Sequence, residues 1–162
     1  MGYEAGIVLD SINSAGERIT TMEVTLPRIV LAEFNTHKRF SRNSSSSRAI
    51  PVEKMLKRVN EDPFMPVYWG KNQKGMQAEQ ELTLGEIEKA NYLWLSARND
   101  AVRSVEVLLE LGVHKQITNR LLEPWLWHTI LVTSTHWDNF FALRCNKNAQ
   151  PEIQKAAIMM RD

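Results

Sequence analysis

The hydrophobic and polar positions in the first third of the chain predict two strands followed by two short helices. Gly6–Ser11 is an apolar run, and Arg18–Leu26 alternates apolar and polar residues, which is typical of a half-buried strand. We expect these two strands to pair as antiparallel neighbours. Pro27 suits the first position of a helix, and Pro51 suits the start of the next one, which should end before Asp62.

The middle of the chain predicts a loop and then one long helix. Residues 62–80 contain two prolines and two glycines with little periodicity, which indicates an ordered surface loop pinned by its aromatic side chains. Thr83 and Glu86 have the spacing of a capping box. Apolar residues at helical spacing then continue to Gly112, so we expect a long helix that ends there.

The last third predicts helices around one further strand. Val113–Glu123 has the pattern of a helix that Pro124 would end. Trp125–Thr135 is rich in aromatic and β-branched residues, as expected of a buried strand. We expect a helix over His136–Cys145 and a final helix that begins at Pro151.

The order of these elements predicts an α+β fold, with a small and mostly antiparallel sheet flanked by helices. Neither an internal repeat nor a composition shift divides the sequence, so we expect residues 1–162 to form a single domain. With 43% hydrophobic residues, the 162-residue chain can bury a substantial core.

Charge and cysteine content narrow the function classes. Lys and Arg number 20 against 19 Asp and Glu, so the net charge of +1 argues against a partner such as long nucleic acid. The single cysteine excludes an internal disulfide and a cysteine-based zinc site. No apolar run has the length of a membrane span, and the N-terminus lacks a signal-peptide pattern. We therefore expect a cytoplasmic protein.

The segment Thr36–Pro51, THKRFSRNSSSSRAIP, has the densest set of groups able to bind phosphate. Four basic residues and a histidine accompany five serines and one asparagine. Arginine forks, serine hydroxyls and the free backbone N–H groups of a non-regular loop are donors suited to a phosphate. The alternative is a solvated serine-rich linker, but the serine run is short and lies between apolar segments. The pattern favours an anion-binding loop.

Two arginines occur next to apolar residues, which suggests that they are partly buried. Arg120 lies within an apolar stretch, and Arg144 ends the run FFAL. A buried arginine needs an anionic partner, which a core ion pair with Glu123 or Glu152 would supply. An arginine at a helix end can also interact with the helix dipole. The third alternative is that both arginines and Arg48 bind one nucleotide.

Other chemistry receives little support from the sequence. One interpretation of Cys145 is a thiolate nucleophile, because the cation of the adjacent Arg144 would lower the pKa of the thiol. A lone cysteine in an apolar segment is more typically a small packed side chain. The four histidines form no metal-ligand pattern, so we expect no metal site. The sequence has neither a G-x-G-x-x-G nor a Walker motif. A dinucleotide would therefore need another mode of binding.

Three blocks of the sequence resemble flavin-dependent thymidylate synthases. The segment 36–48 is similar to the family signature R-H-R-x-x-S-x-N-x-x-S-x-R, with matches at His37, Ser41, Asn43, Ser46 and Arg48. The stretch GVHKQITNRLLEP resembles the segment that carries a nucleotide-binding arginine, here Arg120. The stretch NFFALRCNKNAQPEI resembles the block N-F-x-x-L-R-x-x-x-x-A-Q-x-E-I, with matches at Asn139, Arg144, Ala149, Gln150 and Glu152. The segment SRNSSSSRAIP and the short length of the chain look closest to the compact members of this family from bacteriophages and some bacteria.

The resemblance implies a homotetramer with active sites at subunit interfaces. It implies FAD as cofactor, dUMP as substrate, and NADPH and methylenetetrahydrofolate as co-substrates, for reductive methylation of dUMP to dTMP. It also implies that no protein nucleophile is used, in agreement with a packing role for Cys145. By this resemblance Arg144 would be catalytic, because it would stabilise negative charge that develops on the uracil ring.

The resemblance also assigns residues to ligands by position. The residues that would bind dUMP are Glu33, Ser44, Ser45, Ser46, Ser47, Arg48, Arg120 and Arg144. Glu33 would be presented to the nucleotide of a neighbouring subunit. The residues that would bind FAD are Thr36, His37, Lys38, Ser44, Thr133, Ser134, Thr135 and Asn139.

Four positions depart from the family pattern. Thr36 and Lys38 replace the arginines of R-H-R, Ser44 replaces a usual glutamate, and Glu23 stands where a flavin-contacting histidine is often found. Lysine keeps the charge of arginine but lacks its planar set of N–H donors, and threonine keeps neither the charge nor the donors. The flavin site is therefore the part of the protein that these substitutions affect most. The sequence ends soon after Arg161, which suggests a trimmed or minimal form. Two other hypotheses stay open: a related one-carbon transferase that hydroxymethylates a pyrimidine nucleotide, and a non-enzymatic protein that binds anions or nucleic acid.

Overall fold

The computed structural model describes residues 2–162, which fold into two compact units. The sheet unit comprises the chain up to Ser45 together with Trp127–Asp162, and the helical unit comprises Ser46–Leu126. That residues 1–162 act as one domain stays a prediction.

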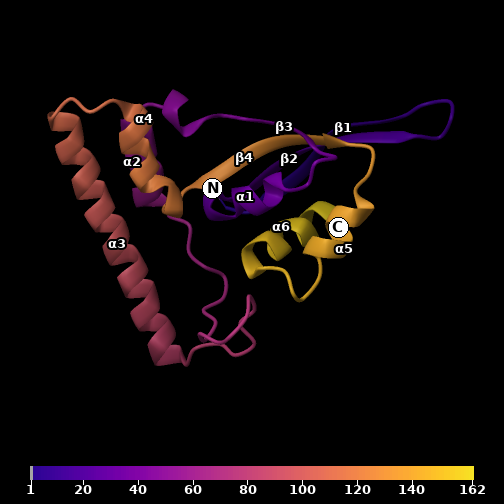
Figure 1. Cartoon of the computed structure of the whole chain (residues 1–162). Helices are drawn as coiled ribbons and strands as arrows, with labels where there is room; N and C mark the ends of the chain where they lie inside the picture. Colours follow the sequence, from indigo (N-terminus) through magenta and orange to yellow (C-terminus); the bar gives the residue numbers. More distant parts are fainter. Residues whose placement is uncertain (1) are drawn as a thin grey trace. The chain divides into compact units, whose positions relative to one another are not determined.

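The sheet unit is built on four antiparallel strands in the order β1-β2-β4-β3 (Figure 1). They are β1 (Glu4–Ile12), β2 (Arg18–Pro27), β3 (Ser41–Ser44) and β4 (Trp127–Ser134). The small antiparallel sheet, the pairing of the first two strands and the strand after Pro124 are confirmed. The α+β class is confirmed as well.

Strand β3 corrects one expectation from the sequence. We expected Ser41–Ser44 to belong to a non-regular loop, but these residues pair with β4 from Thr133 to Ile130. The four side chains are all polar, so no hydrophobic alternation signals the strand. The pairing comes from the open edge of β4, whose backbone groups need partners.

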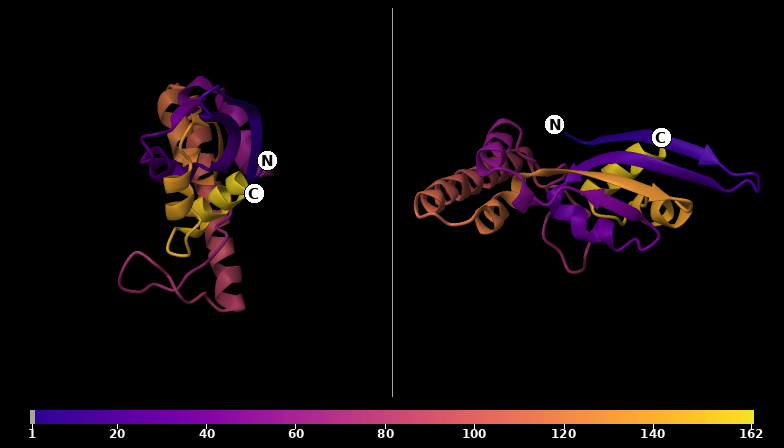
Figure 2. Two further views of the ribbon diagram at one scale, coloured as in Figure 1. Left: turned by 90° about the vertical axis from the view of Figure 1, so that its right-hand side faces the viewer. Right: turned by 90° about the horizontal axis from the view of Figure 1, so that it is seen from above.

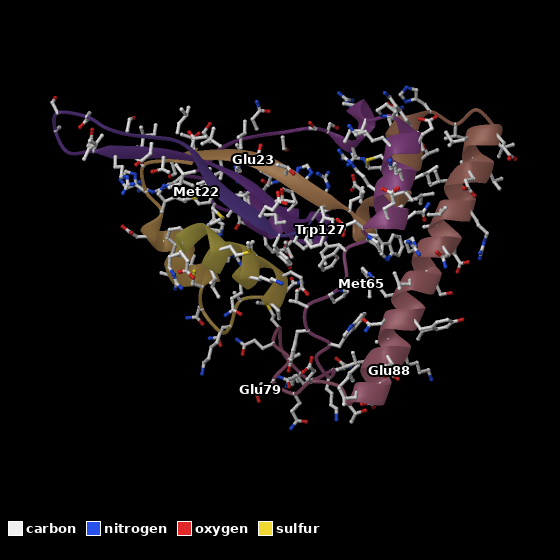
Figure 3. The ribbon with its side chains drawn as sticks, turned by 180° about the vertical axis from the view of Figure 1, so that it is seen from behind. Met22, Glu23, Met65, Glu79, Glu88 and Trp127 are labelled. Carbon is white, nitrogen blue, oxygen red and sulfur yellow. The ribbon has the colours of Figure 1, made fainter. Side chains whose placement is uncertain are left out.

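Three helices cover one face of this sheet: α1 (Leu31–Asn35), α5 (Asp138–Arg144) and α6 (Pro151–Arg161), as Figures 1 and 2 show. Figure 3 labels two neighbours on β2 that face opposite sides of the sheet: Met22 packs against the core, and Glu23 is exposed. The buried residues of this core are Val24, Leu26, Val30, Phe34, Phe40, Ile130, Val132, Phe140, Ile153, Ala156, Ala157 and Met160.

The helix expected at Pro27 begins slightly later. Pro27 is the last residue of β2 and has extended dihedral angles, and a 3-10 turn, η1 (Arg28–Val30), leads into α1. The strand continues through Pro27 because this residue is still paired in register with Trp127 of β4. The short helix then delivers Thr36 and His37 to the turn that follows it.

The helical unit contains a 3-10 turn η2 (Ser47–Ala49), α2 (Val52–Glu61), α3 (Leu84–Glu110), α4 (Lys115–Thr118) and a second 3-10 helix, η3 (Asn119–Trp125). The long α3 (Figure 1) begins with the expected capping box. The buried core residues of the helical unit are Val52, Met55, Val59, Val102, Val105, Leu122, Trp125 and Leu126.

The expected helix over Val113–Glu123 is wrong in two respects. Only Lys115–Thr118 is α-helical, and the 3-10 helix η3 follows and includes Pro124. A 3-10 helix bonds over a shorter span than an α-helix, so proline is accommodated where an α-helix would break. Within residues 2–162, no helix is both long and apolar enough to cross a membrane.

Candidate active site

Arg144 is held by three acceptors of the sheet unit. It is the last residue of α5. Its Nε donates to Nε2 of His37 over 2.9 Å. Its Nη2 donates to the backbone oxygen of Glu33 at 3.4 Å and to Oγ1 of Thr36 at 3.3 Å. No ion pair found in the described part of the chain includes Arg144. The guanidinium therefore keeps its positive charge without a carboxylate to neutralise it.

The acceptor for Arg144 is a buried, neutral imidazole. His37 is 8% exposed, and its ring meets Phe140 edge to face at a centroid distance of 4.8 Å, with Phe40 at 5.8 Å. Burial lowers the pKa of His37, and the positive charges of Arg144 and Arg42 lower it further. Because Nε2 accepts a hydrogen bond from Arg144, the proton of the neutral ring lies on Nδ1.

Two further side chains, those of Thr36 and Arg42, fix the turn that carries His37. Oγ1 of Thr36 donates to the backbone oxygen of Glu33 at 2.7 Å, so this hydroxyl donates to the carbonyl and accepts from Arg144. Nη1 of Arg42, on β3, donates to the backbone oxygens of Phe34 and His37, each at 3.4 Å. The turn after α1 is therefore tied both to α5 and to the sheet.

Glu33 has one unsatisfied group in this region. Its backbone oxygen accepts from Arg144 and Thr36, as above, while its carboxylate Oε2 is buried without a hydrogen-bond partner. A buried carboxylate oxygen without a donor is costly, and a donor on a ligand or water would relieve that cost. This agrees with, but does not test, the prediction that Glu33 contacts the nucleotide.

The end of β4 lies against the same turn. Oγ of Ser134, which is buried, donates to the backbone oxygen of Arg39 at 3.3 Å and also contacts the backbone of His136. Thr133 shares a hydrogen bond of 2.7 Å with Thr21 on β2. Of the predicted flavin contacts, these two hydroxyls are therefore already used inside the protein.

Other predicted flavin contacts are exposed. Lys38, Thr135 and Asn139 are exposed, and Thr135 shares a hydrogen bond with His136. The side chains of Lys38 and Arg39 make no hydrogen bond or ion pair within residues 2–162. Two unneutralised cations therefore lie beside the buried Ser134, on the turn that also presents His37.

Arg120, in the helical unit, has a different environment. Its Nη1 donates to Oε1 of Glu123 at 2.7 Å, and the same oxygen accepts from Oγ of Ser47 at 2.8 Å. The expectation that Arg120 is partly buried is wrong, because its side chain is 48% exposed. It lies on η3, whose apolar neighbours bury Leu122 and leave Arg120 on the open side. The ion pair with Glu123 is present, but it lies at the surface and not in the core as that alternative had it.

The serine segment is supported by an asparagine that sequence reasoning missed. Asn119 is fully buried, and its Nδ2 donates to the backbone oxygens of Ser47 at 2.8 Å and Ile50 at 2.9 Å. Ser44–Ser46 and Arg48 are exposed, whereas Ser47 is buried. The sequence held no signal for these contacts, because the bonded residues are about 70 positions apart and only the fold joins them.

The remaining candidates for chemistry are the single cysteine and a metal site. Cys145 packs against the core of the sheet unit, and burial raises the pKa of its thiol, which fits a packing role. Within residues 2–162 no group of histidine, cysteine and acidic side chains is arranged to hold a metal ion.

Residues 17–162 match the protein family described as thymidylate synthase complementing protein, Thy1. This chain belongs to that family. The resemblance to flavin-dependent thymidylate synthases that the three sequence blocks indicated is therefore confirmed, and the protein is an enzyme of this family. The match covers most of the chain and includes the segments of His37, Arg120 and Arg144.

A solved structure supports the same fold. The chain is similar to the UMP/dUMP methylase PolB from Streptomyces cacaoi bound with 5-Br UMP, with a TM-score of 0.77 and 15% identity, over 98% of this chain and 86% of that chain. At this identity the likeness shows the fold. No curated protein matches the sequence significantly.

Proposed function

We propose that the protein is a flavin-dependent thymidylate synthase that methylates C5 of the uracil of dUMP to give dTMP. Methylenetetrahydrofolate would supply the carbon, NADPH would supply the electrons, and FAD would be the cofactor. Family membership supports this proposal, together with the polar groups that surround Arg144.

The unneutralised charge of Arg144 is the observation that carries the proposal. A uracil must gain electron density at C5 before it can attack a one-carbon unit, and this density is shared with the ring oxygens. A guanidinium with only neutral acceptors stabilises such charge better than one paired to a carboxylate, because no internal anion competes. Arg144 would act in this way as the catalytic residue.

The nucleotide would be held by groups from the serine segment and by Arg120. Ser44–Ser47 and Arg48 offer hydroxyl donors and a guanidinium that are largely exposed, and the Ser47 backbone is fixed by Asn119. Arginine and hydroxyl donors are suited to a phosphate monoester. Glu33 would accept a hydrogen bond from the nucleotide through its unsatisfied carboxylate oxygen.

The residues near His37 fit a flavin with a diphosphate. Lys38 and the neighbouring Arg39 are exposed cations without carboxylate partners in residues 2–162, and Thr135 and Asn139 are exposed polar groups. Thr36, His37, Ser44, Thr133 and Ser134 complete the proposed cofactor contacts. When bound, FAD would supply the hydride that completes the methyl group.

The 2′-hydroxyl of the sugar separates two substrates, dUMP and UMP. A solved structure with the same fold is described as a UMP/dUMP methylase, which makes UMP the alternative substrate for this chain. The buried oxygen of Glu33 is an acceptor that a sugar hydroxyl or a ring N–H would satisfy. Both nucleotides therefore belong in every assay of this protein.

We also propose a homotetramer. Two elements each expose several large apolar side chains, which is typical of surfaces that meet other chains. They are Ile7, Val8, Leu9 and Ile12 on β1, and Leu84, Tyr92, Leu93 and Val107 on α3. Light scattering after gel filtration should give four times the 18.7 kDa mass of the chain, and a monomer would contradict the proposal.

Absorption spectroscopy followed by product analysis tests the function. The purified protein is titrated with FAD, with FMN as control, and then with dUMP or UMP. We expect a flavin band that shifts on addition of the correct nucleotide. Incubation with NADPH and labelled methylenetetrahydrofolate should then place the label in the 5-methyl group of the product. A hydroxymethyl product would favour the related transferase, and absence of both flavin binding and nucleotide binding would contradict the proposal.

A further inference from the structure

The guanidinium of Arg144 has five N–H donors, and the structure accounts for three of them. Nε–H donates to Nε2 of His37, and Nη2 donates to the backbone oxygen of Glu33 and to Oγ1 of Thr36. One whole edge of the guanidinium, formed by Nε and Nη2, is therefore occupied. Nη1 has no hydrogen bond within residues 2–162, so both of its donors are available to a ligand.

One contact in this arrangement comes from a residue that departs from the family signature. Thr36 stands where the resembled signature has an arginine. An arginine has no acceptor, so it could not receive a hydrogen bond from Arg144. The threonine hydroxyl accepts from Nη2 of Arg144 while it donates to the backbone of Glu33 at 2.7 Å, which fixes the direction of its lone pairs.

His37 contributes the shortest contact. Its ring is held edge to face against Phe140, which lies one helical turn before Arg144 on α5. The acceptor and the arginine are therefore placed by the same helix, at 2.9 Å. Burial of the ring keeps it in the neutral form that can accept.

We propose that His37 and Thr36 are positioning residues that fix the plane of the Arg144 guanidinium, so that Nη1 alone meets the substrate. This rests on the proposed function, because Arg144 is the residue that would stabilise charge on the pyrimidine. The class of ligand group that fits is a single carbonyl oxygen of the base, since one nitrogen with two donors remains. A carboxylate or phosphate would instead use two nitrogens in a bidentate contact.

Paired substitutions separate hydrogen bonding from packing. His37→Phe keeps an aromatic ring against Phe140 and removes the acceptor, while His37→Gln loses the ring and keeps an amide oxygen able to accept. If His37 positions Arg144, His37→Phe lowers kcat by about tenfold to a hundredfold, the range for a hydrogen bond to a charged group, and His37→Gln retains more activity. A role in packing alone predicts the reverse order.

Thr36 allows the same comparison with smaller expected effects, because its contact with Arg144 is longer. Thr36→Val should lower kcat by roughly three- to tenfold with little change in nucleotide Kd. Thr36→Ser, which keeps the hydroxyl, should have a kcat close to that of the wild type. Thr25→Val is the matched control, since it removes a hydroxyl contact with Thr129 between β2 and β4 of the same unit. That control should lower stability and leave kcat unchanged.

A second measurement does not require turnover. In the NMR spectrum of the chain labelled with ¹⁵N, the Nε–H signal of Arg144, assigned with Arg144→Lys, should exchange slowly with water. We expect this protection to be lost in His37→Phe and kept in His37→Gln. If both variants keep it, the proposed role of His37 is wrong, whatever the activity shows. If the wild-type chain protects Arg144 but binds neither dUMP nor UMP, then the proposed function fails and the positioning of Arg144 stands.

Discussion

Arg144 and Arg120 are two arginines with opposite surroundings. Arg144 donates to an imidazole, a hydroxyl and a backbone carbonyl, none of which carries a negative charge. Arg120 forms an ion pair with Glu123 at 2.7 Å, and its side chain is 48% exposed. The first arginine is held in place with its charge uncompensated, and the second is compensated and open to solvent.

The difference teaches what each arginine can do for an anionic ligand. Neutral acceptors orient a guanidinium and leave its electrostatic attraction for the ligand intact. A carboxylate partner must be displaced or shared when a phosphate arrives, so part of the new attraction is offset by the lost one. We therefore expect Arg144 to act on the reaction rate and Arg120 to act on nucleotide affinity. The predictions below test this division.

The largest expected effect is that of Arg144→Lys. Lysine keeps the charge but lacks the planar guanidinium, whose Nε and Nη2 contact His37 and Thr36. Negative charge on the pyrimidine would therefore be poorly stabilised. We expect kcat to fall by about 10²- to 10³-fold, as for loss of a preorganised donor. Steady-state kinetics with the methylation assay provides the measurement, and circular dichroism checks the fold. A loss confined to KM would contradict the assignment.

The second prediction concerns Arg120→Gln. Removal of the guanidinium should weaken nucleotide binding by about tenfold to a hundredfold, the range for a charged hydrogen bond, with kcat at saturation changed little. Titration of the flavin band with dUMP gives the Kd. Lys57→Gln, on α2, removes an exposed cation and its Glu61 ion pair elsewhere in the helical unit. It serves as the charge-matched control and should leave the Kd unchanged.

The third prediction has the opposite sign. Glu123→Gln removes the negative charge that Arg120 and Ser47 now contact, while its amide oxygen still accepts from both. We expect nucleotide binding to become roughly two- to fivefold tighter, which corresponds to the free energy of a partly exposed ion pair. In a double-mutant cycle with Arg120→Gln this gain should disappear. If the gain persists without Arg120, Glu123 does not act through that arginine.

The smallest expected effect is a pH dependence of stability from His37. The pKa of His37 is lowered in the folded protein by burial and by Arg144 and Arg42, while in the unfolded chain it lies near about 6.5. Below that pH the unfolded chain takes up the proton first, so the free energy of unfolding falls as the pH drops toward the folded pKa. Above it both states are neutral, and the contribution is constant.

Urea unfolding as a function of pH measures this contribution. His37→Gln should remove it, and Arg144→Gln should reduce it, because one of the two cations that lower the pKa is gone. Arg120→Gln should leave it unchanged. A pH dependence that persists in His37→Gln would assign the effect to another group.

Much of the fold could be predicted because its patterns are local. The alternation in Arg18–Leu26, the capping box at Thr83 and the proline that begins α6 each describe contacts within a few residues. Strand β3 and the 3-10 helix η3 escaped prediction. Both depend on partners elsewhere in the chain, which supply the backbone hydrogen bonds or the packing that the local sequence does not signal.

The candidate site divides in the same way. Its residue types, and the order of the blocks that carry His37, Arg120 and Arg144, are visible in the sequence and were enough to indicate the family. The sequence by itself therefore determined which groups are present and which family they belong to. Only the tertiary structure decided that Arg144 donates to His37, a contact that spans 107 positions, while Arg120 pairs with Glu123 three residues away. The physical reason is that the charge of an arginine is a property of the residue, whereas its partners depend on which distant segments the packed core brings within hydrogen-bond distance.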